Sequence, residues 1–460
     1  MARYEKHRRA VDAIRDDFAR LPSGAAPRIA KRTSNLFRFR TGKPAAKLDV
    51  AAFDEVLQVD PQARTADVQG MVTYERLVDA TLPYGLMPLV VPQLRTITLG
   101  GAVTGLGIES SSFHSGLPHE SVLEMEILTG SGEVVVATPD NEHADLFLAF
   151  PNSYGTLGYA LRLTIELQPV KPYVKLRHLR FDDAAAAMTA LDQVCAARTH
   201  EGELVDFVDG AVFSAGELYL TLGEFVDEAP ATSDYTGMDI YYRSIQRRDI
   251  DYLTVYDYLW RWDTDWFWCS GAFGVQRPGI RRFWPRRYRR SDVYRKLVAL
   301  DRRYQVTARL DRLRGRPRQE AVIQDIEVPI NRVAEFLEFF HRDIGISPVW
   351  LCPLRLRKQP GTGVPRSWPL YPLNPEIRYV NVGFWSTVAL PPGREDGYHN
   401  RLIEDEVTRL DGHKSLYSTA FYPPEEFWRL YNGPLYRKVK DAYDPGGRLL
   451  DLYDKCVKNR

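Results

Sequence analysis

The chain has 460 residues, which exceeds one ordinary domain and fits two or three compact units. Hydrophobic residues make up 44% and charged residues 26%, and a formal net charge of +1 gives no reason to expect nucleic acid as a partner. No apolar run could cross a membrane, and charges occur throughout residues 1–21, so we expect a cytoplasmic protein without a signal peptide. Four dispersed cysteines exclude a disulfide framework and argue against a metal site.

Strand and helix signals alternate through the first 170 residues. Apolar residues at spacings of three and four predict an amphipathic helix over 5–21. The strand-like segments that follow are 51–59, 65–69, 122–128, 134–137 and 160–167, and the helical ones are 73–81 and 145–150. Longer helices are predicted at 183–197 and 291–313, and another from Glu425. A composition change after Pro169 and Pro172 divides the chain into 1–170, 171–415 and a C-terminal segment, 416–460.

The most informative stretch is Thr98–Ser110, where four glycines occur within eight residues. Glycines leave backbone N–H groups uncovered, so such a loop can approach a diphosphate closely. The spacing is neither G-x-G-x-x-G nor that of a P-loop, which disfavours a nicotinamide-type Rossmann fold and a nucleoside triphosphate site. A glycine-rich turn without a ligand is the alternative. A second cluster, Gly155-Thr156-Leu157-Gly158, follows about 50 residues later.

Together these clusters resemble the flavin-binding domain of the vanillyl-alcohol oxidase and p-cresol methylhydroxylase (PCMH) class. Within that class the chain resembles most the delta-24 sterol reductases (the diminuto group). The motifs that also carry the resemblance are Asp145-Leu146-Phe147, Lys171–Arg177, Glu327-Val328-Pro329, Trp350–Pro353, Glu425–Trp428 and Tyr453–Cys456. The resemblance implies an α+β fold with a two-lobed FAD-binding domain at 1–170, an α/β cap at 171–415 and a segment, 416–460, that packs back on the FAD domain.

The resemblance also implies which residues bind FAD. They are Thr33, Ser34, Asn35, Thr98, Leu99, Gly100, Gly101, Thr104, Gly105, Gly107, Ile108, Glu109, Ser110, Gly155, Thr156 and Gly158. Relatives with covalently bound flavin often carry histidine in the first of these loops, whereas residues 32–35 contain none, so we expect non-covalent FAD. The sterol reductases also carry histidine directly after the serine run, where this chain has Phe113.

An isolated C=C bond is not electrophilic, so its reduction by a flavin needs an acid that protonates one carbon first. Three residues are candidates: Glu109 and His114 on the flavin loop, and Tyr417 in the C-terminal third. Glu109 has an alternative role in binding a flavin ribose hydroxyl or forming a salt bridge. No nicotinamide fingerprint appears elsewhere, so NADPH would have to donate electrons at the open face of the same flavin.

Residues 252–290 combine five of the nine tryptophans with seven arginines at 277–290. Aromatic and basic residues gather where proteins touch anionic membranes, so this segment predicts a peripheral contact with the inner face of the cell membrane. Internal pairing with nearby aspartates or a subunit interface is the main alternative, and nucleic acid is a third.

We therefore expect an FAD-dependent oxidoreductase that reduces an unactivated C=C bond of a lipid with NADPH. The resemblance extends to bacterial flavoproteins that reduce the methylene branch of a 10-methylene fatty acyl chain. We prefer this substrate over a sterol for two reasons: residues 1–21 lack the hydrophobic segment of membrane-bound sterol reductases, and the excess of arginine over lysine is common in proteins encoded by GC-rich bacterial genomes. A methyltransferase that makes the methylene group is then an expected partner. The alternatives are a delta-24 sterol reductase, an FAD-dependent alcohol or sugar oxidase, and a non-catalytic lipid-binding protein.

Overall fold

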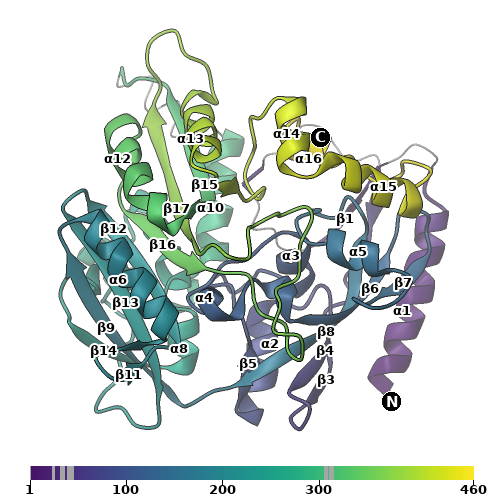
Figure 1. Cartoon of the computed structure of the whole chain (residues 1–460), viewed down its shortest axis with the longest axis horizontal. Helices are drawn as coiled ribbons and strands as arrows, with labels where there is room; N and C mark the ends of the chain where they lie inside the picture. The colour runs from purple at the N-terminus through teal and green to yellow at the C-terminus, as the bar shows by residue number, and fades with distance from the viewer. Residues whose placement is uncertain are drawn as a thin grey trace.

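A computed structural model describes residues 2–22, 26–31, 37–38, 46–304, 309 and 315–459. Two antiparallel sheets dominate the chain, and helices cover their faces (Figure 1). This arrangement confirms the predicted α+β class. The predicted Thr33, Ser34 and Asn35 lie outside the described residues.

The first sheet has the order β3-β4-β8-β6-β7, and β5 pairs with β8. Its strands are β3 (Val56–Asp60), β4 (Thr65–Gln69), β5 (Leu86–Pro88), β6 (Val122–Leu128), β7 (Val134–Ala137) and β8 (Tyr159–Pro169). The helices and short strands around it are α1 (Ala2–Ala19), β1 (Pro27–Ile29), β2 (Ala46–Leu48), α2 (Tyr74–Thr81), η1 (Leu82–Tyr84), α3 (Leu99–Thr104), α4 (Ser112–Ser115), η2 (Pro118–Ser121) and α5 (Ala144–Ala149). The central strand β8 alternates buried and half-buried residues, because one face packs on the core of this domain.

The second sheet has the order β14-β9-β13-β12-β16-β17-β15-β18. Its strands are β9 (Tyr173–Phe181), β12 (Phe207–Ser214), β13 (Glu217–Val226), β14 (Ile250–Thr254), β15 (Gln319–Pro329), β16 (Val349–Leu354), β17 (Tyr379–Ala389) and β18 (His413–Lys414). Helices α6 (Ala184–Ala197), α12 (Val333–Asp343) and α13 (Tyr398–Arg409) share one apolar core with one face of this sheet. The other face carries Trp350 and Cys352, which belong to the core of the first domain.

Besides β14, helical elements lie between β13 and β15 along the chain. They are α7 (Tyr241–Ser244), α8 (Val255–Leu259), η3 (Asp263–Asp265), η4 (Cys269–Phe273), α9 (Pro278–Phe283), η5 (Arg286–Tyr288) and α10 (Ser291–Tyr304). The remaining elements of the cap are the hairpin of β10 (Thr199–His200) and β11 (Glu203–Leu204), and η6 (Ile330–Arg332).

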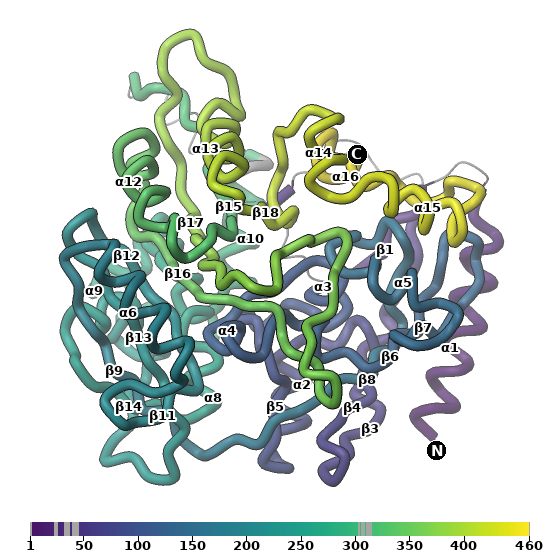
Figure 2. Tube along the Cα trace, viewed as in Figure 1, coloured from purple at the N-terminus to yellow at the C-terminus, as the bar shows by residue number. Residues whose placement is uncertain are grey.

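The chain ends in α14 (Pro424–Leu430), α15 (Gly433–Tyr443) and α16 (Leu452–Cys456). Figure 2 shows these yellow helices beside the purple and blue N-terminal region. Lys440 Nζ donates to the carbonyl of Thr156 at 2.7 Å, and Tyr443 Oη donates to Asp145 Oδ1 at 2.9 Å. The C-terminal helices are therefore anchored on the first domain.

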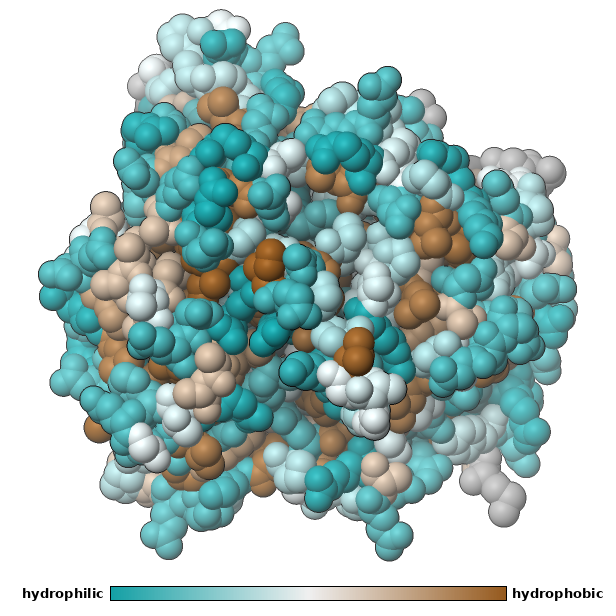
Figure 3. All heavy atoms as spheres, in the orientation of Figure 1, coloured by the Kyte–Doolittle hydropathy of each residue, from teal (hydrophilic) through white to brown (hydrophobic). Residues whose placement is uncertain are grey.

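On the face drawn in Figure 3, hydrophobic residues form small separate spots within a mostly hydrophilic surface. Among the helices of the described ranges, none combines the length and the apolar character that a membrane span requires.

Candidate active site

A cavity of about 830 Å³ lies between the first domain and the second sheet, within the size range of small-molecule and cofactor sites. Its wall includes the glycine-rich segment, residues of the β1 region, strands of the cap and residues near the C-terminus. All three parts of the chain therefore contribute to one site.

The glycine-rich segment is a short helix followed by an extended turn, where the sequence suggested a loop throughout. Thr98 caps α3 by accepting a hydrogen bond from Gly101 N at 3.2 Å. A Cβ on Gly100 would lie 2.7 Å from the carbonyl oxygen of Gly70, directly after β4. Glycine here lets the helix backbone lie against the end of the sheet and present its opposite side to the cavity.

The second glycine turn follows Tyr154 and leads into β8. Gly158 has a φ of +147°, and a Cβ there would lie 2.7 Å from the carbonyl oxygen of Leu128. Both the backbone angle and the close contact therefore require glycine. Thr156 does not line the cavity, because its hydroxyl is buried and donates to the carbonyl of Ser153 at 2.8 Å.

Five basic residues line the same cavity: Arg28, Lys31, Arg38, Arg295 and Lys455. The Arg38 guanidinium is 6% exposed and lies over the ring of Tyr154, 4.5 Å from its centroid. Its Nε and Nη2 atoms have no hydrogen-bond partner in the part of the chain that the structure describes. A buried cation with unpaired donors is costly, so this wall fits a ligand that brings negative charge, such as the diphosphate of FAD.

Aromatic side chains form the wall on the cap side. Phe267 stacks on Trp385 with 4.3 Å between ring centroids, and Trp266 stacks on Phe37 at 5.6 Å. Trp350 is held by its Nε1, which donates to Asp209 Oδ2 at 3.4 Å. The same carboxylate oxygen accepts from Arg261 at 2.7 Å, in an ion pair whose two side chains are 1% exposed. This wall is flat and apolar, as an isoalloxazine ring or an apolar substrate requires.

Two carboxyl groups face the cavity. Glu109 accepts a hydrogen bond from the backbone N of Gln93 at 2.7 Å, and burial raises the pKa of its carboxyl well above the usual value. Asp325 lies on β15, and burial raises its pKa to about 7 against the opposing hydrogen bonds from Asn381 and Tyr417. Tyr417 accepts from Trp385 Nε1 at 3.0 Å.

The structure brings most of the predicted site residues together. Those that line the cavity are Thr98, Gly100, Gly101, Thr104, Gly105, Gly107, Ile108, Glu109, Gly155, Gly158 and Tyr417. Leu99 is buried in the core instead, and the Ser110 hydroxyl bonds that of Tyr258 at 2.8 Å.

The structure places His114 outside the cavity. Its Nε2 donates to the carbonyl of Asp206 at 3.0 Å, while its Nδ1 accepts from the Ser115 hydroxyl at 3.0 Å. Burial, aided by Arg198, lowers the pKa of the imidazole to about 4. A neutral ring with both nitrogens occupied by the protein is not a proton donor at this site.

Sequence reasoning missed Arg38, Lys455, Asp325, Trp350 and Trp385. The motifs 350–353 and 453–456 supported the resemblance, but no pattern in them gave Trp350 or Lys455 a role. Asp325 stands in a strand whose residues Val322, Ile326 and Val328 on the opposite face are buried and apolar, and a carboxyl placed opposite such residues is a usable signal.

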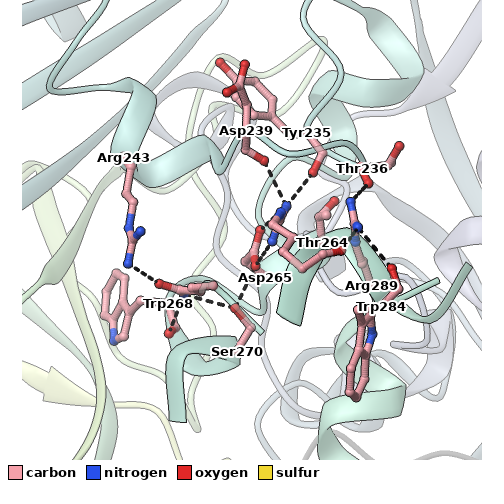
Figure 4. A network of polar contacts seen from close by, with 12 residues as sticks. Tyr235, Thr236, Asp239, Arg243, Thr264, Asp265, Trp268, Ser270, Trp284 and Arg289 are labelled. Atoms are coloured by element: carbon pink, nitrogen blue, oxygen red, sulfur yellow. Dashed lines mark hydrogen bonds and ion pairs between the residues drawn. The ribbon is translucent and has the colours of Figure 1, made fainter. Parts of the chain in front are cut away.

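Much of the aromatic-basic segment lies inside the protein. Trp260 and Trp262 are 1% exposed, and Arg281 pairs with Asp265 at 2.8 Å with both side chains buried. In Figure 4 Arg289 points toward the backbone of Thr236 and Trp284, and its Nη2 donates to the Trp284 carbonyl at 3.0 Å. Burial of charged groups requires such partners, so internal pairing accounts for this part of the segment.

Comparison with known proteins agrees with the geometry. Residues 28–138 match the model of the FAD binding domain family. The chain therefore carries an FAD-binding domain of the PCMH type and is an FAD-dependent oxidoreductase.

The similarity to individual proteins covers most of the chain. It is 29% identical to the Delta(24)-sterol reductase of Arabidopsis thaliana over 445 residues, or 90% of this chain and 77% of that protein. It is 28% identical to the human Delta(24)-sterol reductase over 425 residues, or 88% of this chain and 76% of the relative. A shorter match, 38% over 125 residues, links 27% of each chain with a decaprenylphosphoryl-beta-D-ribose oxidase of Mycolicibacterium smegmatis.

Proposed function

We propose that the protein reduces an unactivated C=C bond of a lipid, with NADPH as the electron donor. The observation that carries this proposal is the aromatic wall of Trp266, Phe267, Trp350 and Trp385 facing the glycine-rich FAD segment across one cavity. Such a wall binds an apolar chain and excludes water, and its ring faces stabilise a cation that forms when an alkene is protonated. Similarity to Delta(24)-sterol reductases along most of the chain supports the same reaction class.

FAD in its reduced form supplies the hydride for such a reduction. The glycine backbone of Gly100–Gly107 and the basic side chains of Arg38 and Lys455 would hold its diphosphate. We propose that FAD is bound non-covalently, because the described residues that line the cavity include neither histidine nor cysteine. Denaturation should then release all flavin, and flavin that stays on the polypeptide would contradict this.

The substrate that we propose is the methylene branch of a 10-methylene fatty acyl chain, with a methyltransferase that installs this carbon as the preceding enzyme. A delta-24 sterol is the second candidate, favoured by the relatives. Both alkenes give a tertiary cation on protonation, so one apolar site suits either. Their shapes differ, since an acyl chain is flexible and a sterol is a rigid ring system.

Anaerobic mixing tests the reaction. NADPH should bleach the bound flavin, and a subsequent addition of the methylene acyl chain should restore its absorbance and yield a product heavier by H₂. Restoration by the sterol alone would select the second candidate. Bleaching by an alcohol or a sugar, with no response to either alkene, would favour an oxidase and overturn the proposal.

We further propose that the exposed part of the aromatic-basic segment contacts an anionic membrane. Phe283 is 84% exposed, and Ile280 and Tyr288 are 41% and 43% exposed. Exposed arginines 277, 282, 286 and 287 surround them on α9 and η5. Apolar side chains among cations suit an anionic headgroup layer, where each charge contributes about 1 kcal/mol.

Flotation with phosphatidylserine vesicles at low and moderate salt tests this contact. Phe283→Ser should reduce the bound fraction, while Val364→Ser, at a residue 63% exposed elsewhere, should not. Equal binding of the two variants, or none by the unaltered protein, would remove this surface as the contact.

A further inference from the structure

Asp325 occupies an unusual place on the cap sheet. Its strand neighbours Val322, Ile326 and Val328 are buried in the apolar core shared with the cap helices. Side chains alternate along a strand, so Asp325 points to the opposite face, and there it lines the cavity. A carboxyl group has thus been placed among Trp350, Trp385 and Tyr417 on the wall that faces the FAD-binding domain.

The neighbouring strand is shaped to receive this carboxyl. Gly383 of β17 is the register partner of Asp325, and a Cβ at Gly383 would collide with Asp325 Oδ1. Asn381, two residues earlier on the same strand, donates its Nδ2 to Oδ1 at 3.3 Å. The carboxyl is therefore oriented by its neighbours.

Asp325 has no ion-pair partner among the residues that the structure describes. The titratable groups that face it are Glu327 on its own strand, Tyr417 after β18, and Tyr154 of the first domain. None of these is a cation that would hold the carboxylate ionised. Glu109, by contrast, receives a backbone N–H and lies near the buried Arg261.

We propose that Asp325 is the catalytic acid of this site and donates its proton to one carbon of the substrate alkene. The proposal rests on the reductase function above. Asn381 and the pair Trp385–Tyr417 act as positioning residues that fix the carboxyl and the hydroxyl beside it.

The step balances in atoms and electrons. The alkene π bond breaks, one carbon forms a C–H bond with the Asp325 proton, and the other becomes a tertiary cation. That cation takes up the hydride, so the substrate gains two electrons that NADPH has supplied through the cofactor. Asp325 is left as a carboxylate and regains its proton from water.

The test compares Asp325→Asn with Glu327→Gln, a buried carboxyl on the same strand face that does not line the cavity. Asp325→Asn should keep its FAD content and its bleaching by NADPH, whereas reoxidation by the alkene should fall about 10²- to 10⁴-fold. Glu327→Gln should be reoxidised within a few-fold of the unaltered protein. Reoxidation of Asp325→Asn at the unaltered rate would overturn the proposal.

The pH profile gives a second criterion. With a pKa raised to about 7 by burial, Asp325 is protonated below that pH, so the reoxidation rate should fall as the pH rises through 7. Asp325→Asn should lose this dependence, and Glu327→Gln should keep it. A dependence that persists in Asp325→Asn would assign the proton to another group.

Infrared titration of the FAD-loaded protein separates this proposal from the reductase function. The unaltered protein and Glu327→Gln should show a protonated carboxyl band that disappears near pH 7 and is missing from Asp325→Asn, in addition to the band of Glu120, whose pKa burial also raises to about 7 and which all three proteins share. Without that band Asp325 is not the acid, even if alkenes are reduced. With the band present but no alkene reduced, the reductase function fails, and the role of Asp325 as its acid fails with it.

Discussion

The two walls of the cavity differ in the kinds of residue that form them. The FAD-side wall includes a stretch of glycine-rich backbone, brought into place by glycines such as Gly100 and Gly158 that lie against Gly70 and Leu128. The cap-side wall is made of large side chains, with Trp350 oriented by the buried pair of Asp209 and Arg261.

This difference explains what each wall can do. Backbone amides and glycines bind a phosphate group in a way that depends little on neighbouring side chains. A wall of side chains sets shape, polarity and proton supply, and it depends on buried partners far away in sequence. Asp209 and Trp350, for example, are 141 residues apart. We expect the cap wall to be the more sensitive of the two to loss of a buried polar partner.

The largest effect should come from Asp209→Ala. The substitution leaves the Arg261 cation buried without its counter-charge and releases the indole N–H groups of Trp262 and Trp350. Breaking a buried ion pair from one side typically costs about 3–5 kcal/mol of unfolding free energy. Urea unfolding measures the loss. Asp227→Ala, at an exposed aspartate paired with Lys171, should leave the midpoint unchanged. Equal midpoints for both variants would show that this pair does not support the wall.

Gly158→Ala should rank second and act on the FAD-side wall. Its methyl group would meet the Leu128 carbonyl, and its φ of +147° is unfavourable for alanine. Strain and overpacking together should cost about 3 kcal/mol. Gly202→Ala is the control, because Gly202 has a φ of +84° but nothing within 4 Å of a Cβ. It should cost only about 1 kcal/mol. A loss as large in Gly202→Ala would mean that crowding at Gly158 contributes nothing.

The sequence predicted the first domain better than the cap. Strand β4 was predicted at its observed bounds, and the hairpin of β6 and β7 likewise, because alternating apolar residues flank a Thr-Gly-Ser-Gly turn. The division at residues 170 and 415 stays a prediction, although the strands of each large sheet fall on one side of it. The glycine clusters were found because close backbone approach leaves a visible trace in the sequence.

The residues of the cap wall are not marked by a comparable pattern in the sequence. Tryptophans 260–268 suit a membrane surface or a buried wall equally well, and only tertiary contacts decide between them. Asp325 becomes conspicuous once β15 is paired with β17, since the space that Gly383 leaves for its carboxyl depends on register between strands about 60 residues apart. Register over such separations cannot be predicted from local periodicity.

Lys455→Met should have a moderate effect, and it tests whether the basic residues that line the cavity bind the diphosphate of FAD. Lys455 Nζ donates to the Tyr154 carbonyl at 2.5 Å and lines the cavity beside Arg38. Methionine keeps the aliphatic stem but removes the charge that would face a diphosphate, so FAD should bind about tenfold more weakly. Titration of apoprotein with FAD measures this. Lys458→Met, at the exposed lysine paired with Asp454, is the matched control and should bind FAD normally. Unchanged affinity in Lys455→Met would place the diphosphate elsewhere.

The smallest effect should come from His114→Gln, at a residue outside the cavity. The ring spans the Asp206 carbonyl and the Ser115 hydroxyl, and glutamine can replace at least one of these bonds. Loss of the other should cost about 1 kcal/mol of unfolding free energy. Because the pKa of His114 is lowered to about 4, the ring is neutral from pH 5 to 8 in the folded protein and supplies no proton there. Flavin bleaching by NADPH and reoxidation by the alkene should therefore proceed at unaltered rates, with the same pH profile. A pH profile that changes in this variant would return His114 to the reaction and remove the reason for preferring Asp325.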